Sequence, residues 1–124
     1  MDLKEGDIMN YYKKDINHVR GDTFSIGLKI EDFEQALDNV YFTCRDSLSD
    51  DSNLLFQKSL GEGITLVEEH GHTYSYAVRV APSDTRNIAS GTYYYDMQIN
   101  INEDIFTVMK GKFIIEQDAT WEEE

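Results

Sequence analysis

The chain has 124 residues, of which 40% are hydrophobic, and its formal net charge is −13, from 24 acidic and 11 basic side chains. That length suits a single domain with its own core, and the negative charge disfavours binding to nucleic acid or to an anionic membrane surface. Cys44 is the one cysteine, which excludes an internal disulfide, and no run approaches the ~20 apolar residues of a membrane-spanning helix.

Residues 1–16 are predicted to form a peripheral leader that is partly disordered. The first eight carry several charges and little apolar surface, so their sequence gives them no reason to pack. Lys4-Glu5-Gly6 can be encoded by a purine-rich ribosome-binding sequence placed shortly before Met9. We therefore expect translation to start at Met9, and deletion of the leader to change the free energy of unfolding by less than roughly 0.5 kcal/mol. His18, just beyond the leader, is expected at a strand edge.

Seven segments alternate apolar and polar side chains with the period of two that indicates a half-buried strand. They cover residues 23–31, 40–45, 54–58, 64–67, 73–80, 92–101 and 105–116. The short segment 32–37 has too few apolar side chains to establish a helical face. Pro82-Ser83-Asp84-Thr85 indicates a turn or a single helical turn with Ser83 as its cap.

Seven short strands without a long helix predict an all-β fold, an immunoglobulin-like antiparallel β-sandwich over residues 17–120, followed by an acidic tail at 121–124. Asn102–Asp104 is expected to form a tight hairpin connection, and Gly111 to mark a bulge or a close approach of two backbones. The predicted core comprises Phe24, Ile26, Leu28, Phe42, Val78, Tyr93, Tyr95 and Phe113.

The sequence assigns no catalytic residue, cofactor or metal ligand. His70 and His72 lack further ligands at zinc spacing, so we interpret Glu68–His72 as a polar hairpin tip. Asp50-Asp51 and Glu103-Asp104 lack the spaced ladder of a calcium loop and are interpreted as solvated loop charge. The serines of residues 47–52 have no nucleophile-elbow motif, and Cys44 is interpreted as a small core residue.

The run Tyr93-Tyr94-Tyr95 supplies the candidate binding residues. On a strand, Tyr93 and Tyr95 face the core, whereas Tyr94 points outward together with Asp96 and Gln98. An outward tyrosine can anchor a protein interface or stack on a sugar. Tyr94, Asp96 and Gln98 are therefore predicted to form an interface.

Four motifs carry a resemblance to a known family. They are Val19-Arg20-Gly21-Asp22-Thr23-Phe24-Ser25-Ile26, Pro82-Ser83-Asp84-Thr85, Ser90-Gly91-Thr92-Tyr93-Tyr94-Tyr95-Asp96-Met97-Gln98 and Lys110-Gly111-Lys112-Phe113-Ile114-Ile115. In order and spacing they resemble the N-terminal domains of phage baseplate upper proteins and related tailed-phage modules, over roughly residues 18–120. The resemblance also explains Arg20-Gly21-Asp22 as a turn before a strand better than as an integrin-binding tripeptide.

The resemblance implies a non-enzymatic structural module that mediates protein–protein assembly in a phage or prophage tail, baseplate or fibre. Its partners would be other phage structural proteins and further copies of the chain. It would be synthesised in the bacterial cytoplasm and become a virion component. The alternative left open is a carbohydrate-binding β-sandwich that uses its exposed tyrosines and loop carboxylates; a small hydrolase has no supporting constellation of residues.

Overall fold

The computed structural model describes residues 2–4 and 11–119. In chain order these residues form β1 (Asp2–Lys4), β2 (Tyr12–Lys13), β3 (Ile16–Val19), β4 (Phe24–Glu31), β5 (Asn39–Arg45), β6 (Leu54–Leu60), β7 (Gly63–His70), β8 (Thr73–Val80), α1 (Pro82–Thr85), β9 (Gly91–Ile101) and β10 (Asp104–Glu116). No helix in the described part of the chain is long and apolar enough to cross a membrane.

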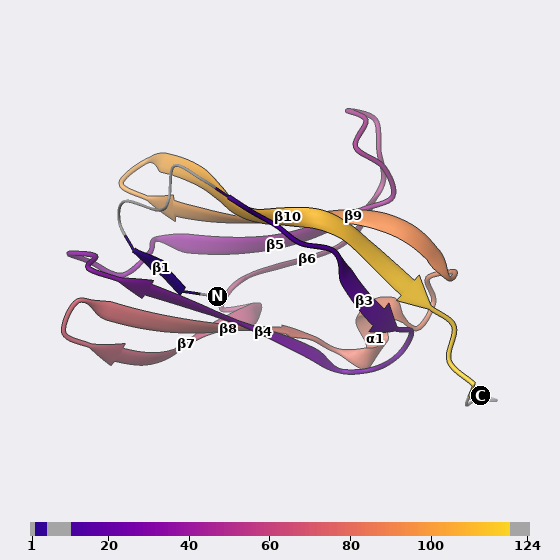
Figure 1. The fold of residues 1–124 in the computed structure, drawn as a ribbon, viewed down its shortest axis with the longest axis horizontal. Coiled ribbons are helices and arrows are strands. Elements are labelled where there is room, and N and C mark those ends of the chain that lie inside the picture. The colour runs from indigo at the N-terminus through magenta and orange to yellow at the C-terminus, as the bar shows by residue number, and fades with distance from the viewer. Residues whose placement is uncertain (1, 5–10, 120–124) are drawn as a thin grey trace.

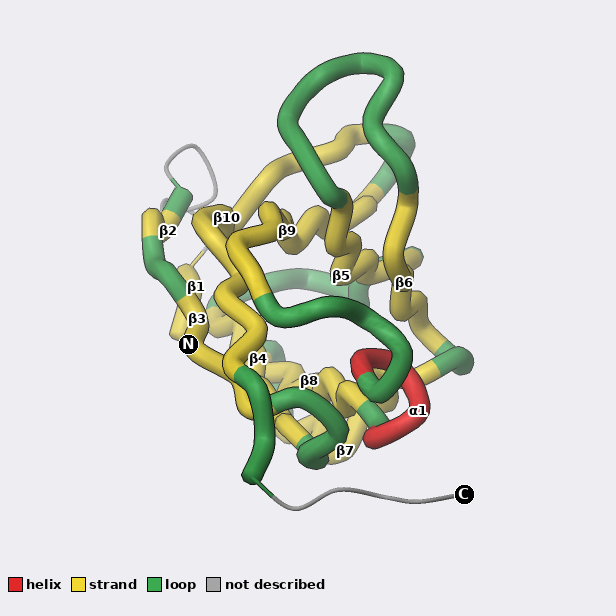
Figure 2. Tube along the Cα trace, turned by 90° about the vertical axis from the view of Figure 1, so that its right-hand side faces the viewer, coloured by secondary structure: helices red, strands yellow, loops and turns green. Residues whose placement is uncertain are grey.

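The strands lie in two facing layers (Figure 1). The β4 layer has the order β1-β4-β8-β7, and the β9 layer has the order β6-β5-β9-β10, with β2 and β3 both paired to β10. A short parallel contact between β6 and β7, at Ser59 with Gly63 and Leu60 with Ile64, joins the layers along one side. The sheet is therefore continuous in its hydrogen bonding but folded over on itself, as the view along the strands also shows (Figure 2).

This architecture confirms the predicted all-β, immunoglobulin-like sandwich. Each of the seven predicted strands is present, and the long neighbours pair antiparallel, β4 with β8, β5 with β9 and β9 with β10. The two-residue connection at Asn102 and Glu103 has φ values of 51° and 73°, as a type I′ hairpin turn requires. The sequence missed the three short strands β1, β2 and β3, all of which pair parallel to their neighbours.

The expectation that residues 1–8 have no reason to pack is wrong for Leu3. β1 pairs with β4, Leu3 lies opposite Ile30, and the Leu3 side chain is fully buried. Ile16, at the end of the predicted leader, is likewise buried in β3. A three-residue strand is too short to show a period of two, and one well-placed leucine is sufficient to anchor it. Met9 and the predicted start site lie outside the described residues, as does the acidic tail 121–124.

Of the two alternatives expected at Gly111, a bulge or a close approach, the structure has the close approach there and a bulge earlier in β10. The register with β9 shifts between Thr107 and Met109, which marks a bulge. Gly111 itself is the close approach: a Cβ atom there would lie 2.1 Å from the carbonyl oxygen of Lys14. The N-terminal segment runs alongside β10 between β2 and β3 at this point, where the Lys14 N–H donates to the Lys110 carbonyl over 2.9 Å.

The core fills the space between the layers. Of the predicted core residues, Leu28, Phe42, Val78, Tyr95 and Phe113 are buried, and Cys44 is buried as expected. The other three, Phe24, Ile26 and Tyr93, are half-buried residues that pack against this core. The Phe113 ring is its aromatic centre, with ring centroids 6.3 Å from Phe42, 6.3 Å from Tyr95 and 5.8 Å from Phe56.

The turn α1 closes one end of the sandwich between the layers (Figure 2). Its cap is Ala81, whose N–H donates to the Asp84 carboxylate over 2.7 Å, so the expectation of Ser83 as the cap is wrong. Asp84 also forms an ion pair with Lys58 of β6 at 2.7 Å. One carboxylate thus satisfies the start of the turn and joins it to the β9 layer.

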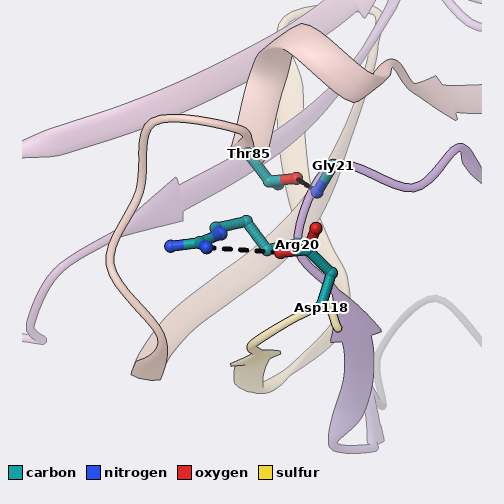
Figure 3. Close-up of polar contacts among 4 residues, drawn as sticks. All are labelled: Arg20, Gly21, Thr85 and Asp118. Carbon is teal, nitrogen blue, oxygen red and sulfur yellow. Dashed lines mark hydrogen bonds and ion pairs between the residues drawn. The ribbon is translucent and has the colours of Figure 1, made fainter. Parts of the chain in front are cut away.

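His18 is not at a strand edge as expected but is buried, 3% exposed, beneath α1. Its Nε2 lies 3.2 Å from Thr85 Oγ1, and that oxygen accepts the Gly21 N–H over 2.9 Å. Beside it Arg20 forms an ion pair with Asp118 at 3.2 Å (Figure 3). Arg20, Gly21 and Asp22 form a turn with φ of 83° at Gly21, so the predicted turn is confirmed.

Candidate functional site

The predicted interface residues lie on the outward face of β9. Tyr94, Asp96 and Gln98 alternate with the buried Tyr95, Met97 and Ile99, and all three are half-buried. Their position follows from the period of two, since a strand packed on one side presents every second side chain outward. Their role as an interface stays a prediction.

Neighbouring strands extend this face into rows of three side chains. The registers align Arg45, Tyr94 and Lys112 in one row and Thr43, Asp96 and Lys110 in the next. The following rows are Tyr41, Gln98 and Thr107, and then Asn39, Asn100 and Ile105. Directly opposed side chains in a sheet have Cβ atoms about 5 Å apart, so the members of each row are in reach of one another. We call these rows the β9 face.

Hydrogen bonds hold the polar middle of the β9 face. Gln98 Nε2 donates to Thr107 Oγ1 over 3.5 Å, and Gln57 of β6 donates to Thr43 Oγ1 over 2.9 Å. Asn39 Nδ2 donates to the Tyr41 hydroxyl over 3.1 Å. These contacts fix the side chains in place and leave a surface with both donors and acceptors.

Beside the first two rows the loop 46–53 rises from the end of β5 and returns to β6 (Figures 1 and 2). A cleft of about 390 Å³ lies between this loop and the β9 face. Its lining comprises Thr43, Arg45, Ser47, Leu48, Ser49, Asp50, Ser52, Tyr94, Tyr95, Asp96 and Lys110. A shallower hollow of about 280 Å³ continues past Asp96 toward Gln98 and Gln57.

Asp96 is the electrostatic centre of the cleft. Burial raises the pKa of its carboxyl group, although Arg45 and Lys110 act in the opposite direction. Lys110 also places its Nζ 4.7 Å from the centroid of the Tyr11 ring, a cation–π contact. The site therefore holds a partly desolvated carboxylate between two cations.

A larger hollow, of about 780 Å³, lies between segment 12–17 and residues 24–27 of β4. Its walls include Ile16, Phe24, Ile26 and Met109, which belong to the core or pack directly against it. This larger hollow is the margin of the interlayer core. We therefore regard the cleft beside Tyr94 as the better candidate site, although its volume is smaller.

The groups with other chemistry remain apart. His70 is the last residue of β7, His72 lies in the turn before β8, and both are exposed. No cluster suited to a metal ion occurs within residues 2–4 and 11–119. Asp50 and Asp51 are exposed in the loop 46–53. Cys44 is buried, and burial raises its pKa to about 12, so its thiol stays protonated.

Sequence reasoning placed three residues of the β9 face but missed their neighbours. The alternation of residues 40–45 puts Arg45 outward, but only strand pairing sets it beside Tyr94. Lys110 and Lys112 depend on the bulge after Thr107, because a one-residue shift exchanges the two faces of a strand. The adjacent buried pair Val108 and Met109 is the sequence signal of that bulge.

Neither the comparison with protein-family profiles nor that with curated proteins yields a match. Among solved structures, a family 123 glycoside hydrolase from Clostridium perfringens aligns at 12% identity and a TM-score of 0.54, over 87% of this chain and 23% of that one. A marsupial T cell receptor aligns at 11% identity and a TM-score of 0.43, over 88% and 52%. The extracellular domain of a voltage-gated sodium channel β4 subunit aligns at 15% identity and a TM-score of 0.35, over 86% and 92%.

At these identities the likeness to the hydrolase concerns the fold alone. The chain spans 23% of that enzyme's length, so it corresponds to a part of the enzyme and not to the whole. The other two scores are too low to support an argument.

Proposed function

We propose that this chain is a non-enzymatic structural module of a phage or prophage virion, which mediates protein–protein assembly in a tail, baseplate or fibre through its β9 face. The family resemblance supplies the phage context. Its four motifs fall at the turn before β4, at α1, along β9 and in β10 at Gly111.

The observation that carries the proposal is the composition of the β9 face. No described element covers it, and it combines Tyr94, fixed polar side chains and the isoleucine Ile105, which is 61% exposed. At the loop tip Leu48 is 82% exposed. Aromatic and apolar anchors set among ordered polar groups are typical of protein interfaces.

The test is co-expression with the tail or baseplate proteins encoded beside this chain, followed by purification and light scattering. A complex or a homo-oligomer is expected, and Gln98→Arg should abolish it because the new charge lies in the middle of the face. Ser75→Arg is the matched control, since Ser75 is a half-buried polar residue on β8 of the other layer. A monomer with no affinity for any neighbouring gene product contradicts the proposal, as does a complex that survives Gln98→Arg.

Carbohydrate binding is a second candidate, because the cleft beside Tyr94 places an aromatic ring among polar side chains that can bond to sugar hydroxyls. The aligned glycoside hydrolase acts on glycolipid glycans, but that likeness is one of fold. The second candidate depends on the cleft alone.

A further inference from the structure

The cleft beside Tyr94 has a wall that is ordered before any ligand arrives. At the neck of the loop 46–53, the Asp46 carboxylate accepts the N–H and the Nδ2 of Asn53, both over 2.9 Å, and the Asp46 N–H donates to the Asn53 carbonyl. These bonds also hold the pKa of Asp46 below its ordinary value. Because the wall is already ordered, a ligand would bind with a smaller loss of loop entropy.

The loop 46–53 also forms hydrogen bonds to Arg45 of β5 and between its own residues. Arg45 Nη1 donates to the Ser52 carbonyl over 3.4 Å, and the Ser52 N–H donates to the Ser49 carbonyl over 3.1 Å. The Ser49 hydroxyl bonds to the Asp51 carboxylate. Serine side chains of this wall line the cleft opposite the β9 face.

Charge within the cleft is balanced. Two cations, Arg45 and Lys110, and two carboxylates, Asp50 and Asp96, line it. A strongly anionic ligand would meet Asp96 in the floor, and a cation would meet Arg45 and Lys110. The balance favours a neutral ligand that both donates and accepts hydrogen bonds.

The remaining lining adds apolar contact to these polar groups. Tyr94 is half-buried in the row between Arg45 and Lys112, and Leu48 comes from the loop tip. The face of a tyrosine ring packs against apolar C–H groups while its hydroxyl stays hydrated. A volume of about 390 Å³ lies in the lower part of the ~300–1,000 Å³ range of small-ligand pockets.

We propose that this cleft binds a neutral saccharide, with one sugar face against the Tyr94 ring and its hydroxyl groups hydrogen-bonded to Asp96, Arg45 and the loop serines. Sugars present an apolar C–H face and a rim of hydroxyls that donate and accept, and the cleft offers the matching set. The inference gives the carbohydrate-binding candidate a site and a ligand class. It does not depend on the assembly proposal, since a monomer contains the whole cleft.

The test is a screen of the full chain against neutral and acidic oligosaccharides, followed by NMR titration with the neutral oligosaccharide that gives the strongest signal. Chemical-shift changes are expected at Arg45, Tyr94, Asp96 and loop residues, with little dependence on salt. Tyr94→Ala and Asp96→Asn should each weaken binding at least about tenfold, equal to ~1.4 kcal/mol. Tyr94→Phe should retain most affinity because it keeps the ring.

Tyr12→Ala is the matched control, since Tyr12 is an exposed tyrosine, 50% exposed, outside the cleft. The proposal is overturned if no neutral saccharide shifts the cleft resonances, or if Tyr94→Ala and Asp96→Asn bind as the wild type does. Binding of acidic sugars alone, lost at high salt, also overturns it and assigns the cleft to anions. Ile105→Arg separates the two proposals, because Ile105 is an exposed anchor of the β9 face that lines neither the cleft nor the adjoining hollow, so the change should disrupt assembly and leave sugar binding intact.

Discussion

The two sides of β10 differ in what they contribute. On its edge β10 pairs with β2 and β3, where Ile16 is buried and Lys14 lies against Gly111. The same N-terminal segment also supplies β1, which pairs with β4 of the other layer and buries Leu3. We call the contacts of β1, β2 and β3 the N-terminal seam. On its outward side β10 contributes Lys110 and Lys112 to the β9 face, which no described element covers. The comparison suggests that the seam serves stability and that the β9 face is available for binding.

Gly111→Ala should break the seam most severely. The added Cβ would lie 2.1 Å from the Lys14 carbonyl oxygen and 2.7 Å from its carbon, so backbone has to move. The same carbonyl accepts the Tyr95 hydroxyl over 2.6 Å, a bond that the shift would weaken. We expect a loss of about 3 kcal/mol in the free energy of unfolding, measured by urea denaturation.

Gly27→Ala in β4 is the control, because a Cβ there meets no heavy atom within 4 Å. It should change the free energy of unfolding by less than ~1 kcal/mol. Equal effects of the two substitutions would show that close approach at Gly111 is not the cause.

Leu3→Ala tests whether the first strand belongs to the fold. Leu3 is fully buried and packs with the core cluster, so we expect a loss of about 2 kcal/mol, the lower end for a buried leucine because the strand is short. Thermal and urea unfolding would measure it. A change below ~0.5 kcal/mol would restore the interpretation of residues 1–8 as a segment without a packing role.

The seam was the least predictable part of the fold from sequence. The strands β4, β5, β8 and β9 are predictable from sequence because apolar and polar side chains alternate along them over at least four positions. β1 and β2 have three and two residues, and their partners lie far along the chain. The burial of His18 depends on α1 closing over it, which no local pattern encodes.

On the β9 face, the outward side chains of β9 itself were predictable, but the residues beside them on other strands were not. Alternation within one strand places Tyr94, Asp96 and Gln98 outward, but it does not select the neighbours of that strand. The cleft needs the pairing of β5 with β9, the bulge in β10 and the fold of the loop 46–53. Each of these is a tertiary choice, since a shift of one residue in register would bury Lys110 and expose Gly111.

His18 should make the seam sensitive to pH. Burial lowers its pKa, and the charge of Asp22 opposes this only in part. The folded state therefore binds the proton less readily than the unfolded chain, whose histidine pKa is about 6.5. The contribution of His18 to the free energy of unfolding is therefore fully present above pH ~6.5. It falls as the pH drops toward the folded-state pKa, by at most ~1.4 kcal/mol per pH unit.

Urea midpoints measured from pH 8 to pH 5 would show this fall. The control is His18→Gln, which keeps a side-chain donor for Thr85 without titrating in that window. It should flatten the dependence even if it lowers stability at every pH. An unchanged slope in the variant would assign the dependence to other groups.

Asp96→Asn should have the smallest effect on stability, and the opposite sign. Burial raises the pKa of Asp96 above its ordinary value despite Arg45 and Lys110, so the folded state binds its proton more tightly than the unfolded chain does. When it is ionised at neutral pH, the Asp96 carboxylate therefore lowers the free energy of unfolding. That free energy should rise as the pH falls through the folded-state pKa of Asp96 and then through its lower unfolded-state pKa. The group is half-buried and not fully buried, so solvent screening keeps the cost small.

Replacing Asp96 with the neutral isostere should therefore raise the free energy of unfolding at pH 7 by a few tenths of a kcal/mol, within ~0.5. The gain should vanish at acidic pH, where the wild-type carboxyl is itself neutral. The same substitution is expected to weaken saccharide binding, so stability and binding would change in opposite directions. Such a trade-off is common where a functional site contains a group that destabilises the folded state. If Asp96→Asn instead destabilises the protein by ~1 kcal/mol or more at pH 7, Asp96 belongs with Arg45 and Lys110 as a structural ion cluster, and the β9 face contributes to stability as the seam does.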